Sequence, residues 1–576
     1  MKILSLHCDY IKFRPLKKAL REPEQLAKED ENGKEARECL VILTSVEKSD
    51  GQNSSGIVDN LVANIKDIAS QVNCKKIVLY PYAHLATDLA SPSEAMNILE
   101  NSESELAKQK FDVIRAPFGY YKEFELKCKG HPLSELSRVI SADGKTKIED
   151  SKALKAEEKY DYKQLLNQIS KSKLDTSKIK DNDHRILGQR MELFSFNDVA
   201  PGMVFWHNNG LIIYNELLKF WREEHLKAGY QEISTPFVLD KKLWQISGHW
   251  EKYKENIFLT KYEGRDFAVK PMNCPGGILI YKSRPRSYRE LPMRVAELGI
   301  VHRQELSGVL AGLFRVIKIT QDDAHIYCRE EQLENEIIGV IELIDRVYKK
   351  FGFEYHVELS TRPEKRIGDD KLWDKAEKVL ESVLKKCKVK FKTNKGDGAF
   401  YGPKIDFHIK DSLGRTWQCA TIQLDFAMPE RFELGYIAED NKVCRPVMIH
   451  RTVYGSLERF IGILLEHLNG NLPVWLAPVQ VKIVSFTTKN IPYAQKIKEK
   501  FASEGIRVDS DFEPERVEAK IRDAEIQKIP YIIVIGDKEQ QKGTLAVRTH
   551  GAKGVKFDVK LNEFIDELKG KIKERK

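Results

Sequence analysis

The chain of 576 residues has room for roughly three or four domains of about 150 residues each. Its 41% hydrophobic and 31% charged residues are typical of a globular protein, and no apolar run approaches the ~18 to 20 residues of a membrane span. The net charge of +9 favours polyanionic partners only weakly. Nine scattered cysteines without a CxxC pair, and an N-terminus without a signal-peptide pattern, predict a soluble cytoplasmic protein that makes no membrane contact.

The N-terminal part of the chain has the pattern of a small α/β domain. Short apolar runs, among them 39–46 and 75–80, predict strands, and the apolar residues between these two runs recur at helical spacing. The sequence that follows is dense in Lys, Asp, Glu and Ser and poor in large apolar residues. We therefore expect a domain at 1–142 and a charged linker with partial helix at 143–190.

The central block, 191–472, contains strand-like segments that are not separated by regular crossover helices. An amphipathic helix is predicted to end at Gly229, and the strand-like run after it is interrupted by Pro236, which cannot donate to a sheet ladder. That strand is therefore expected at a sheet edge or an interface. Segment 417–426 alternates as a strand does, and 454–468 has the pattern of a helix. These features predict an antiparallel sheet with helices around it.

The remaining residues, 473–576, alternate between short apolar runs and helical patterns. Runs such as VQVKIVSF and PYIIVIGD are separated by amphipathic segments. This order predicts a βαβαβ-like module with a mixed sheet. The expected fold class is therefore a multidomain chain of α/β and α+β domains.

The segment TQDDAHIYC (320–328) raises the first question of chemistry, because it places polar side chains in a predicted strand. Neighbouring residues of a strand point to opposite faces, so Gln321, Asp323 and His325 share one face while Asp322 lies on the other. The shared face fits either a solvated edge strand or the polar floor of a pocket that could hold a metal. The segment alone leaves both interpretations open.

Three further motifs contain candidate functional side chains. VKPMNCPGG holds Cys274 in a rigid turn, although a lone cysteine is more often a buried structural residue. In PVMIHRTVYGSLERF, Arg459 lies in the first turn of a predicted helix, where the dipole disfavours a cation; it either serves an anionic ligand or is a surface arginine. VHRQELSGVLAGLFRVIKI has arginines on both sides of a Ser/Gly-rich loop, which fits phosphate binding or an exposed hairpin. No P-loop or GxGxxG motif is present.

Together these motifs resemble the class II aminoacyl-tRNA synthetases, and specifically the archaeal-type threonyl-tRNA synthetases. YQEISTPF resembles motif 1, which builds the dimer interface, HRQELSGVL with FRV resembles motif 2, and GSLERF resembles motif 3. Runs that resemble the threonyl enzymes are SGHWEKY, KPMNCPG, TQDDAH, STRPEKRIGD, AFYGPKIDF, TWQCATIQLDF and VMIHR. The resemblance implies a D-aminoacyl-tRNA deacylase-like editing domain at 1–142, a class II catalytic domain with an antiparallel sheet at 191–472, and an α/β anticodon-binding domain at 473–576.

The resemblance also implies that Cys274, His325 and His450 bind one Zn²⁺ per subunit. Three protein ligands leave coordination positions open, as substrate-binding zinc sites require. In this family those positions take the amino and hydroxyl groups of L-threonine. Valine lacks the oxygen, whereas serine lacks only a methyl group, worth roughly 1 to 3 kcal/mol or 10- to 200-fold. A second, hydrolytic filter against serine is therefore expected.

The same resemblance assigns the sites for ATP and threonine. Arg303 would hold the α-phosphate and the carboxylate, Glu305 would contact adenine, and Arg315 and Arg459 would hold the distal phosphates together with Mg²⁺. His249 matches the position implicated in transfer to the tRNA ribose. Further residues expected along the ATP and threonine pocket are Met272, Gln321, Asp323, Tyr401, Gln418, Gln423 and Ser456.

The N-terminal domain resembles the archaeal threonyl editing domain, which implies hydrolysis of seryl-tRNA(Thr). His84, Tyr121, Lys122 and Glu135 are the candidate residues, with Lys122 and His84 expected to position water and discriminate the aminoacyl group. The alternative is a surface lysine and a histidine at a strand end.

The C-terminal module resembles the class II anticodon-binding domain. Arg522, Glu539 and Arg548 match positions implicated in the reading of anticodon bases, whose edges are exposed in single-stranded RNA. The lysines of the tail KGKIKERK would supply attraction to phosphates.

Three departures from the family pattern fall near the expected catalytic site. Gly277 and Ala311 replace histidines that are common in the family, and VIKI (316–319) replaces VRGF. They affect the expected contacts to ATP and to the acceptor end more than the reaction itself.

The expected function is that of a threonine–tRNA ligase, which joins L-threonine to tRNA(Thr) with ATP, edits in cis and forms a homodimer through motif 1. Two alternatives remain open. One is a catalytically silent paralogue that binds tRNA or mRNA as a regulator. The other is an editing hydrolase whose synthetase part only docks the tRNA.

Overall fold

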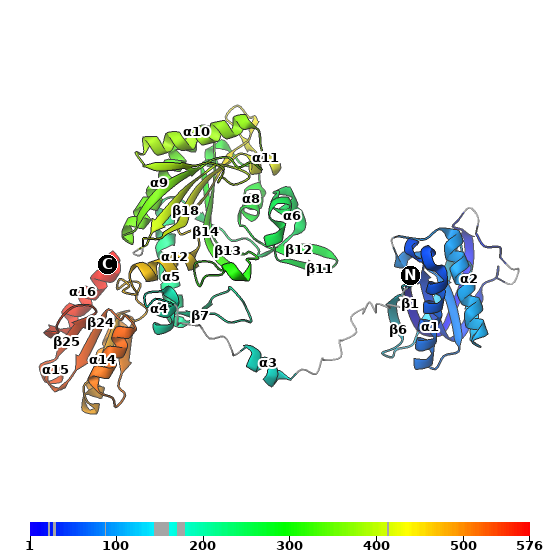
Figure 1. The fold of residues 1–576 in the computed structure, drawn as a ribbon, viewed down its shortest axis with the longest axis horizontal. Coiled ribbons are helices and arrows are strands. Elements are labelled where there is room, and N and C mark those ends of the chain that lie inside the picture. The colour runs from blue at the N-terminus through cyan, green and yellow to red at the C-terminus, as the bar shows by residue number, and fades with distance from the viewer. Residues whose placement is uncertain (21–22, 27–29, 87, 143–160, 170–178, 412–413) are drawn as a thin grey trace. The chain divides into compact units, whose positions relative to one another are not determined.

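The computed structural model divides the chain into two compact units, Met1–Asp161 and Tyr162–Lys576 (Figure 1). The residues that the structure describes are 1–20, 23–26, 30–86, 88–142, 161–169, 179–411 and 414–576. Much of the expected linker therefore lies outside the described residues. Its described parts include two helices, α3 (Tyr162–Ile169) and α4 (His184–Arg190). Among the described residues, no helix is both long and apolar enough to cross a membrane.

The N-terminal unit is an α/β domain built on one six-stranded sheet. Its elements are β1 (Lys2–Lys18), β2 (Lys34–Ser45), α1 (Ser54–Gln71), β3 (Lys76–Pro81), α2 (Pro92–Lys108), β4 (Asp112–Arg115), β5 (Tyr120–Cys128) and β6 (Glu135–Val139). The strands run in the order β4-β3-β2-β1-β5, and β6 pairs with the other end of β1. Alternate residues of β2 face opposite sides of the sheet, so Leu40 and Ile42 pack against the helices while Val41 and Leu43 form a second core.

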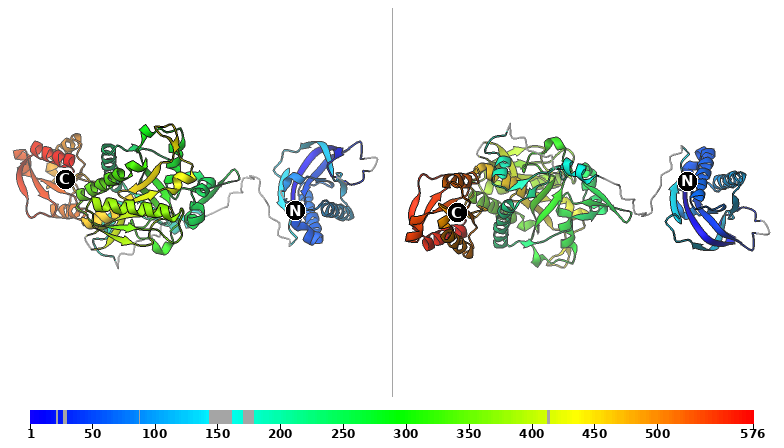
Figure 2. Two further views of the ribbon diagram at one scale, coloured as in Figure 1. Left: turned by 90° about the horizontal axis from the view of Figure 1, so that it is seen from above. Right: turned by 90° about the horizontal axis from the view of Figure 1, so that it is seen from below.

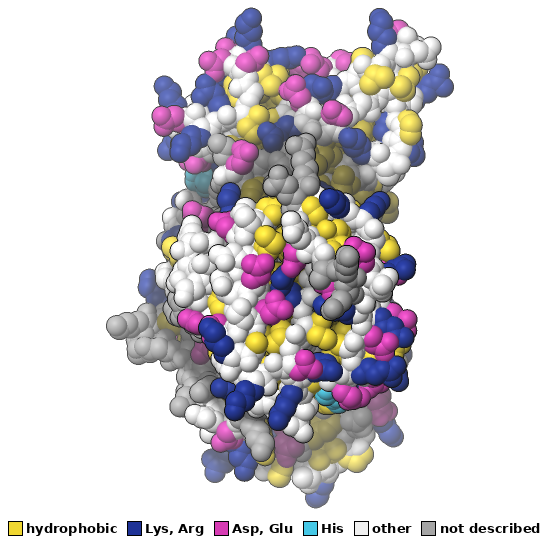
Figure 3. Space-filling model, turned by 90° about the vertical axis from the view of Figure 1, so that its right-hand side faces the viewer, with side chains coloured by type: hydrophobic (Ala, Val, Ile, Leu, Met, Phe, Trp, Pro, Cys, Tyr) yellow, Lys and Arg dark blue, Asp and Glu magenta, His cyan; other side chains and the backbone are white. Residues whose placement is uncertain are grey.

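The two helices α1 and α2 pack against each other and cover one face of this sheet (Figures 1 and 2). The side of the molecule drawn in Figure 3 mixes basic and acidic side chains rather than gathering either sign. The N-terminal unit contains exposed ion pairs such as Lys12–Glu35 and Arg14–Glu123. The weak overall positive charge is thus not concentrated on that side.

The central part of the second unit is built on an eight-stranded sheet with the order β16-β15-β17-β18-β21-β14-β13-β9. The strands of this part are β7 (Phe194–Ser195), β8 (Phe205–Trp206), β9 (Gln231–Glu232), β10 (Val238–Asp240), β11 (Leu259–Tyr262), β12 (Arg265–Val269), β13 (Met293–His302), β14 (Lys318–Cys328), β15 (Glu354–Ser360), β16 (Phe391–Asn394), β17 (Lys404–Lys410), β18 (Thr416–Asp425), β19 (Tyr436–Ile437), β20 (Val443–Cys444) and β21 (Val447–Thr452). The helices are α5 (Asn208–Lys227), α6 (Lys241–Ile246), α7 (His249–Tyr253), α8 (Cys274–Lys282), α9 (Leu333–Lys350), α10 (Asp370–Lys386), α11 (Ala427–Arg431) and α12 (Leu457–His467).

The long strands of this sheet pair antiparallel, as the sequence predicts, and two pairs with short strands, β13–β9 and β15–β16, are parallel. The run interrupted by Pro236 forms β9, at the edge of the sheet, and β10, in a separate small sheet. Apolar residues of the long strands pack with α5, α9, α10 and α12 into the largest core. The polar residues that alternate with them are therefore left to the opposite face.

The last hundred or so residues form a mixed five-stranded sheet with the order β23-β22-β24-β25-β26 (Figures 1 and 2). Its elements are β22 (Val481–Ser485), α13 (Ile491–Ser503), β23 (Val508–Asp511), α14 (Val517–Ile526), β24 (Tyr531–Ile535), α15 (Asp537–Lys542), β25 (Thr544–Thr549), β26 (Lys556–Lys560) and α16 (Leu561–Glu574). Helices α13 and α16 share one core with the sheet, and α14 packs in another. The predicted mixed sheet is confirmed.

Candidate active site

A cavity of about 320 Å³ lies on the polar face of the eight-stranded sheet. The predicted residues that line it are Met272, Cys274, Arg303, Gln321, Asp323, His325, Tyr401, Gln418, Gln423, His450, Ser456 and Arg459. These residues come from segments that span almost two hundred positions of the chain. The fold therefore brings together the residues predicted to bind the metal ion, the residues predicted to bind threonine, and some of the residues predicted to bind ATP.

Strand β14 forms part of the floor of this cavity. Gln321, Asp323 and His325 line it. Asp322 lies on the other face, where its carboxylate accepts hydrogen bonds from the backbone N–H of Val453 at 2.9 Å and from Trp221 Nε1 at 3.3 Å. Because β14 lies between β21 and β13 inside the sheet, the interpretation as a solvated edge strand is wrong.

Cys274, His325 and His450 form a cluster of buried metal-ligand side chains. One ligand atom from each lies within 4.8 Å of the others. Cys274 is the first residue of α8, and the two histidines are direct partners across β14 and β21. Their rings stand nearly perpendicular, with centroids 5.0 Å apart. This arrangement follows from strand pairing, which places partner side chains side by side on one face.

The donor set of this cluster fits Zn²⁺, which prefers thiolate and imidazole ligands. His450 Nε2 lies 2.8 Å from Asp425 Oδ2, so the carboxylate orients the ring as second partners of zinc-bound histidines do. Burial lowers the pKa of His325 well below its usual value, which keeps the imidazole neutral. Burial raises the pKa of the Cys274 thiol, so a metal ion would have to displace its proton.

A polar network beside the cluster orients the side chains that are predicted to bind the substrate threonine. Asn273 Nδ2 donates to Asp323 Oδ2 at 2.7 Å, and Arg303 Nη2 donates to Gln321 Oε1 at 3.2 Å. Arg303 Nε also donates to the carbonyl of Pro271 at 3.1 Å. Burial raises the pKa of the Asp323 carboxyl, while the amide of Asn273 opposes that shift. Sequence reasoning missed Asn273, although it lies inside the quoted run KPMNCPG.

The N-terminus of α12 is attached to β14 by buried carboxylates. Ser456 caps the helix by accepting the backbone N–H of Arg459 at 3.2 Å, and Glu458 accepts the N–H of Thr320 at 2.9 Å. Arg459 does not point along the helix: its Nε donates to the carbonyl of Phe314 at 3.0 Å and its Nη1 to that of Gln418 at 3.0 Å. Its guanidinium is thereby held at the wall of the cavity.

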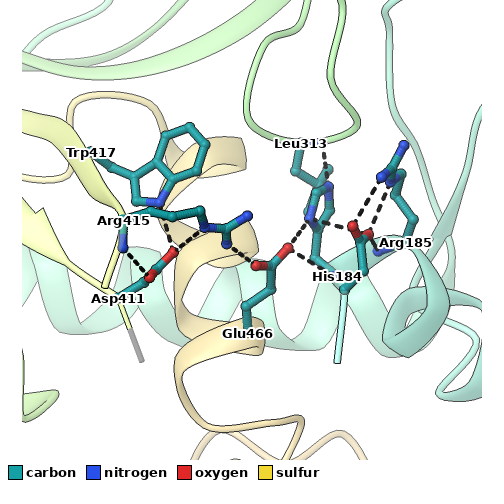
Figure 4. Close-up of polar contacts among 8 residues, drawn as sticks. His184, Arg185, Leu313, Asp411, Arg415, Trp417 and Glu466 are labelled. Atoms are coloured by element: carbon teal, nitrogen blue, oxygen red, sulfur yellow. Dashed lines mark hydrogen bonds and ion pairs between the residues drawn. The ribbon is translucent and has the colours of Figure 1, made fainter. Parts of the chain in front are cut away.

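The motif 2 turn that precedes β14 is held by a buried histidine from α4 (Figure 4). The backbone N–H of Leu313 donates to His184 Nε2 at 2.9 Å, and His184 Nδ1 lies 2.7 Å from Glu466 Oε1 on α12. A Cβ atom at Gly312, where φ is +53°, would lie 2.2 Å from His184 Nε2. Glycine is therefore required at this close approach.

The same network continues to the hairpin between β17 and β18 (Figure 4). Arg415 forms ion pairs with Glu466 and, at 2.7 Å, with Asp411, whose carboxylate also accepts Trp417 Nε1 at 2.9 Å. The ring of Phe314 stacks on Trp417 at 4.2 Å. No sequence pattern pointed to His184 or Glu466, because their contact joins positions 282 residues apart.

Some of the predicted catalytic residues do not line the cavity. Glu305 and Arg315, which are predicted to bind ATP, pair with each other at 2.9 Å and are not among its lining residues. His249 is fully buried, with Nδ1 2.8 Å from Ser247 Oγ and Nε2 2.9 Å from the sulfur of Met272. Burial lowers the pKa of His249 to about 3, so its imidazole is neutral.

Two of the three departures from the family pattern have defined neighbours in the structure. A Cβ atom at Gly277 would lie 3.4 Å from His325 Nδ1 and in contact with it, so the glycine leaves space next to a candidate ligand. The backbone N–H of Ala311 donates to the carbonyl of Arg315 at 3.2 Å and closes the motif 2 turn.

A second cavity, of about 350 Å³, lies in the N-terminal unit and is lined by Tyr80, His84, Tyr121 and Lys122 among others. Lys122 Nζ donates to the carbonyls of Pro117 at 2.8 Å and Tyr120 at 3.2 Å. Burial lowers the pKa of Lys122 to about 8. This cavity thus combines apolar walls with an amine that loses its proton easily.

Glu135 does not line the second cavity. It pairs with Leu6 near one end of β1, whereas Lys122 pairs with Pro15 near the other end. At about 3.3 Å per residue these positions are roughly 30 Å apart. The expectation that Glu135 shares a site with Lys122 has no support in the strand register.

The predicted anticodon residues lie on three elements of the C-terminal module. Arg522 is exposed on α14, Glu539 lies on α15 with its carboxylate accepting the N–H of Gly536, and Arg548 lies on β25. Their roles stay predictions.

The comparisons with known proteins cover all three parts of the chain. Residues 1–140 match the archaea-specific editing domain of threonyl-tRNA synthetase, 258–468 match the tRNA synthetase class II core domain (G, H, P, S and T), and 476–571 match the anticodon binding domain. The crystal structure of the RNA binding domain of threonyl-tRNA synthetase from Cryptosporidium parvum Iowa II is 39% identical, with a TM-score of 0.65 over 67% of this chain and 98% of that one. The chain belongs to the threonyl-tRNA synthetase family.

The curated relatives of this threonyl-tRNA synthetase family member include two bacterial threonine–tRNA ligases. That of Carboxydothermus hydrogenoformans is 56% identical over 397 residues, which are 69% of this chain and 62% of the relative. That of Caldanaerobacter subterraneus subsp. tengcongensis is 54% identical over 389 residues, 68% of this chain and 60% of the relative. The chain thus spans about three fifths of the length of these relatives. The resemblance and the fold class predicted from the motifs are confirmed.

Proposed function

We propose that the protein is a threonine–tRNA ligase with an editing activity. It activates L-threonine with ATP, transfers it to tRNA(Thr), and hydrolyses seryl-tRNA(Thr) in the N-terminal unit. The observation that carries this proposal is the single cavity in which the cluster of Cys274, His325 and His450 lies beside Arg303 and Arg459. A site for a hydroxyl-bearing amino acid thus adjoins a site for anionic oxygens.

Cys274, His325 and His450 would hold the Zn²⁺ ion. When bound, the ion would supply coordination positions for the amino and hydroxyl groups of threonine. Asp323, fixed by Asn273, lines the same cavity and would accept a hydrogen bond from the amino group of threonine. Valine offers no oxygen to such a site, which supports discrimination against it, whereas serine requires the second filter.

The activation step needs charge stabilisation more than acid–base chemistry. The carboxylate oxygen of threonine attacks the α-phosphorus of ATP, the bond to the bridging β-phosphate oxygen breaks, and pyrophosphate leaves with the electron pair. Arg303 and Arg459 would offset the developing charge, together with Mg²⁺ on the distal phosphates. The Glu305–Arg315 pair would separate when adenine and the distal phosphates bind between them.

The second cavity would carry out the hydrolytic step. A water oxygen attacks the ester carbon of seryl-tRNA(Thr) and gives up a proton, the bond from that carbon to the ribose oxygen breaks, and the ribose oxygen leaves with the electron pair and takes up a proton. Lys122 and His84 would position the water and the acyl group, and Tyr121 would form a wall of the pocket. Because the pKa of Lys122 is lowered to about 8, a fraction of its amine is unprotonated near neutral pH and can accept a hydrogen bond from water.

The proposed ligase function also implies binding partners and a cellular compartment. The C-terminal module would contact the anticodon through Arg522, Glu539 and Arg548. A homodimer would form at the motif 1 edge, where Phe237 and Val238 are about half exposed beside Pro236. The nine free cysteines support a reducing compartment, the cytoplasm.

Threonine-dependent exchange between ATP and pyrophosphate tests the proposal. Exchange with threonine, far weaker exchange with valine, and release of serine from seryl-tRNA(Thr) are expected from the pure zinc-loaded protein. If the protein binds tRNA but catalyses no ATP–pyrophosphate exchange, the regulatory paralogue is favoured. Serine release without any threonine exchange would favour the editing hydrolase.

A further inference from the structure

A second group of metal-ligand side chains lies on the eight-stranded sheet, outside the cavity. His356 and Glu358 are two residues apart on β15 and so share one face, and His408 on β17 is the direct partner of His356. His356 Nε2 lies 3.6 Å from Glu358 Oε1, and His408 Nε2 lies 3.7 Å from Glu358 Oε2. The three ligand atoms lie within 4.8 Å of one another.

No permanent cation neutralises this carboxylate among the described residues. The carboxylate of Glu358 lies beside the two imidazoles, and Asn394 Nδ2 donates to it at 3.2 Å. Lys404, on the same face of β17, pairs instead with Asp397 and Asp406. Glu358 is partly buried, with 23% of its side chain exposed, so water screens its charge only in part.

We propose that His356, Glu358 and His408 form a second metal site, for Zn²⁺ or another late first-row divalent ion. These ions accept two imidazoles and one carboxylate as ligands. Here two of the ligands are two residues apart on β15 and the third is on the neighbouring strand β17, so all three lie on one face of the sheet. Mg²⁺ and Ca²⁺ would need more oxygen ligands.

The distances require little movement to reach coordination geometry. Ligand atoms at about 2.05 Å from a tetrahedral ion lie roughly 3.4 Å apart. Each imidazole lies within a few tenths of an ångström of that distance from a different oxygen of Glu358, and one ligand atom from each residue lies within 4.8 Å of the others, so the carboxylate must turn to place one oxygen between the two rings. The imidazole rings are stacked, 4.9 Å between centroids and 10° between planes, so they must rotate toward each other when they bind the ion.

A third group with ligand atoms, Asp183, His184 and Glu466, does not qualify. Both ring nitrogens of His184 already have protein partners, Glu466 Oε1 and the backbone N–H of Leu313. A metal ion would have to displace the contact that holds the motif 2 turn.

Metal titration of the full-length protein tests the proposal. After metal removal, addition of Zn²⁺ and desalting, the metal content of the wild type should exceed that of the double variant His356→Ala/His408→Ala by one ion per chain. Glu358→Gln, which keeps the shape of the side chain, should weaken this site at least tenfold. His207→Ala, at an exposed histidine outside the three clusters, should change nothing.

Co²⁺ separates this site from the cluster that contains a cysteine. Co²⁺ bound to His356, Glu358 and His408 should give visible d–d absorption but no thiolate-to-cobalt charge-transfer band. This absorption should remain in Cys274→Ser. Circular dichroism checks that each variant is folded. Equal metal content in the wild type, the double histidine variant and Glu358→Gln would overturn the proposal, whatever the state of the Cys274 site.

Discussion

The two units surround a buried charged group with different numbers of hydrogen-bond partners. In the central sheet, the buried carboxylate of Asp322, on the face opposite the cavity, accepts the backbone N–H groups of Val453, Tyr454 and Gly455. In the N-terminal unit, Lys122 has two carbonyls as partners and a pKa lowered to about 8 by burial. Burial raises the pKa of Asp322 to about 6 and lowers that of Lys122, so both charges are held at a cost in stability, but the N–H donors offset part of that cost at Asp322.

The largest effect is expected at Asp322. Asp322→Ala leaves three buried N–H groups without an acceptor and should lower the free energy of unfolding of the second unit by about 3 to 5 kcal/mol. Asp322→Asn keeps one acceptor oxygen and should lose less. Urea unfolding followed by tryptophan fluorescence measures this, because all seven tryptophans lie after residue 161. Equal stability of Asp322→Ala and the wild type would contradict the comparison.

The opposite sign is expected at Lys122. The unfolded chain holds the lysine proton up to pH of about 10.5, whereas the folded chain releases it near pH 8. The unfolded state therefore binds more protons between these values, and the stability of the N-terminal unit rises with pH across that window. Lys122→Met should raise stability at pH 7 and flatten this rise.

The Lys122 experiment follows the unfolding of the N-terminal unit by circular dichroism. Because this unit contains no tryptophan, its unfolding transition is the one that tryptophan fluorescence does not report. Lys76→Met is the matched control, because Lys76 lies on the same sheet but pairs with Asp112 near the surface. A wild type whose stability falls between pH 8 and pH 10 relative to Lys122→Met would reverse the predicted sign.

A smaller, kinetic effect is expected at His184. Glutamine can replace the Nε2 acceptor for the N–H of Leu313 but not the contact to Glu466, and asparagine does the reverse. If the motif 2 turn positions ATP, His184→Asn should raise the KM for ATP about fivefold with a smaller change in kcat, and His184→Gln should stay near the wild type. The same KM for both variants would show that the turn does not depend on this contact.

The sequence predicted those parts of the site that follow from strand alternation and from quoted motifs. Gln321, Asp323 and His325 lie on one face, as a period of two requires, and the motif runs carry the other lining residues. The resemblance to the editing domain groups Glu135 with Lys122, and only the register of β1 shows how far apart they lie.

Contacts between distant segments could not be predicted. Asp425 lies in the quoted run TWQCATIQLDF, yet its partner His450 lies on another strand. His184 falls in the segment expected to be a charged linker, and nothing local indicates that its ring would reach Leu313 and Glu466. Hydrogen bonds of this kind are set by tertiary packing, which periodicity and composition do not encode.

The most direct test of the central claim is metal analysis of Cys274→Ser together with its threonine activation, with Cys387→Ser as the control at a cysteine outside the cavity. The account predicts that Cys274→Ser loses the zinc ion of this cluster and at least a hundredfold of threonine-dependent pyrophosphate exchange, while Cys387→Ser keeps both. Full exchange by a Cys274→Ser protein that has lost this zinc would contradict it.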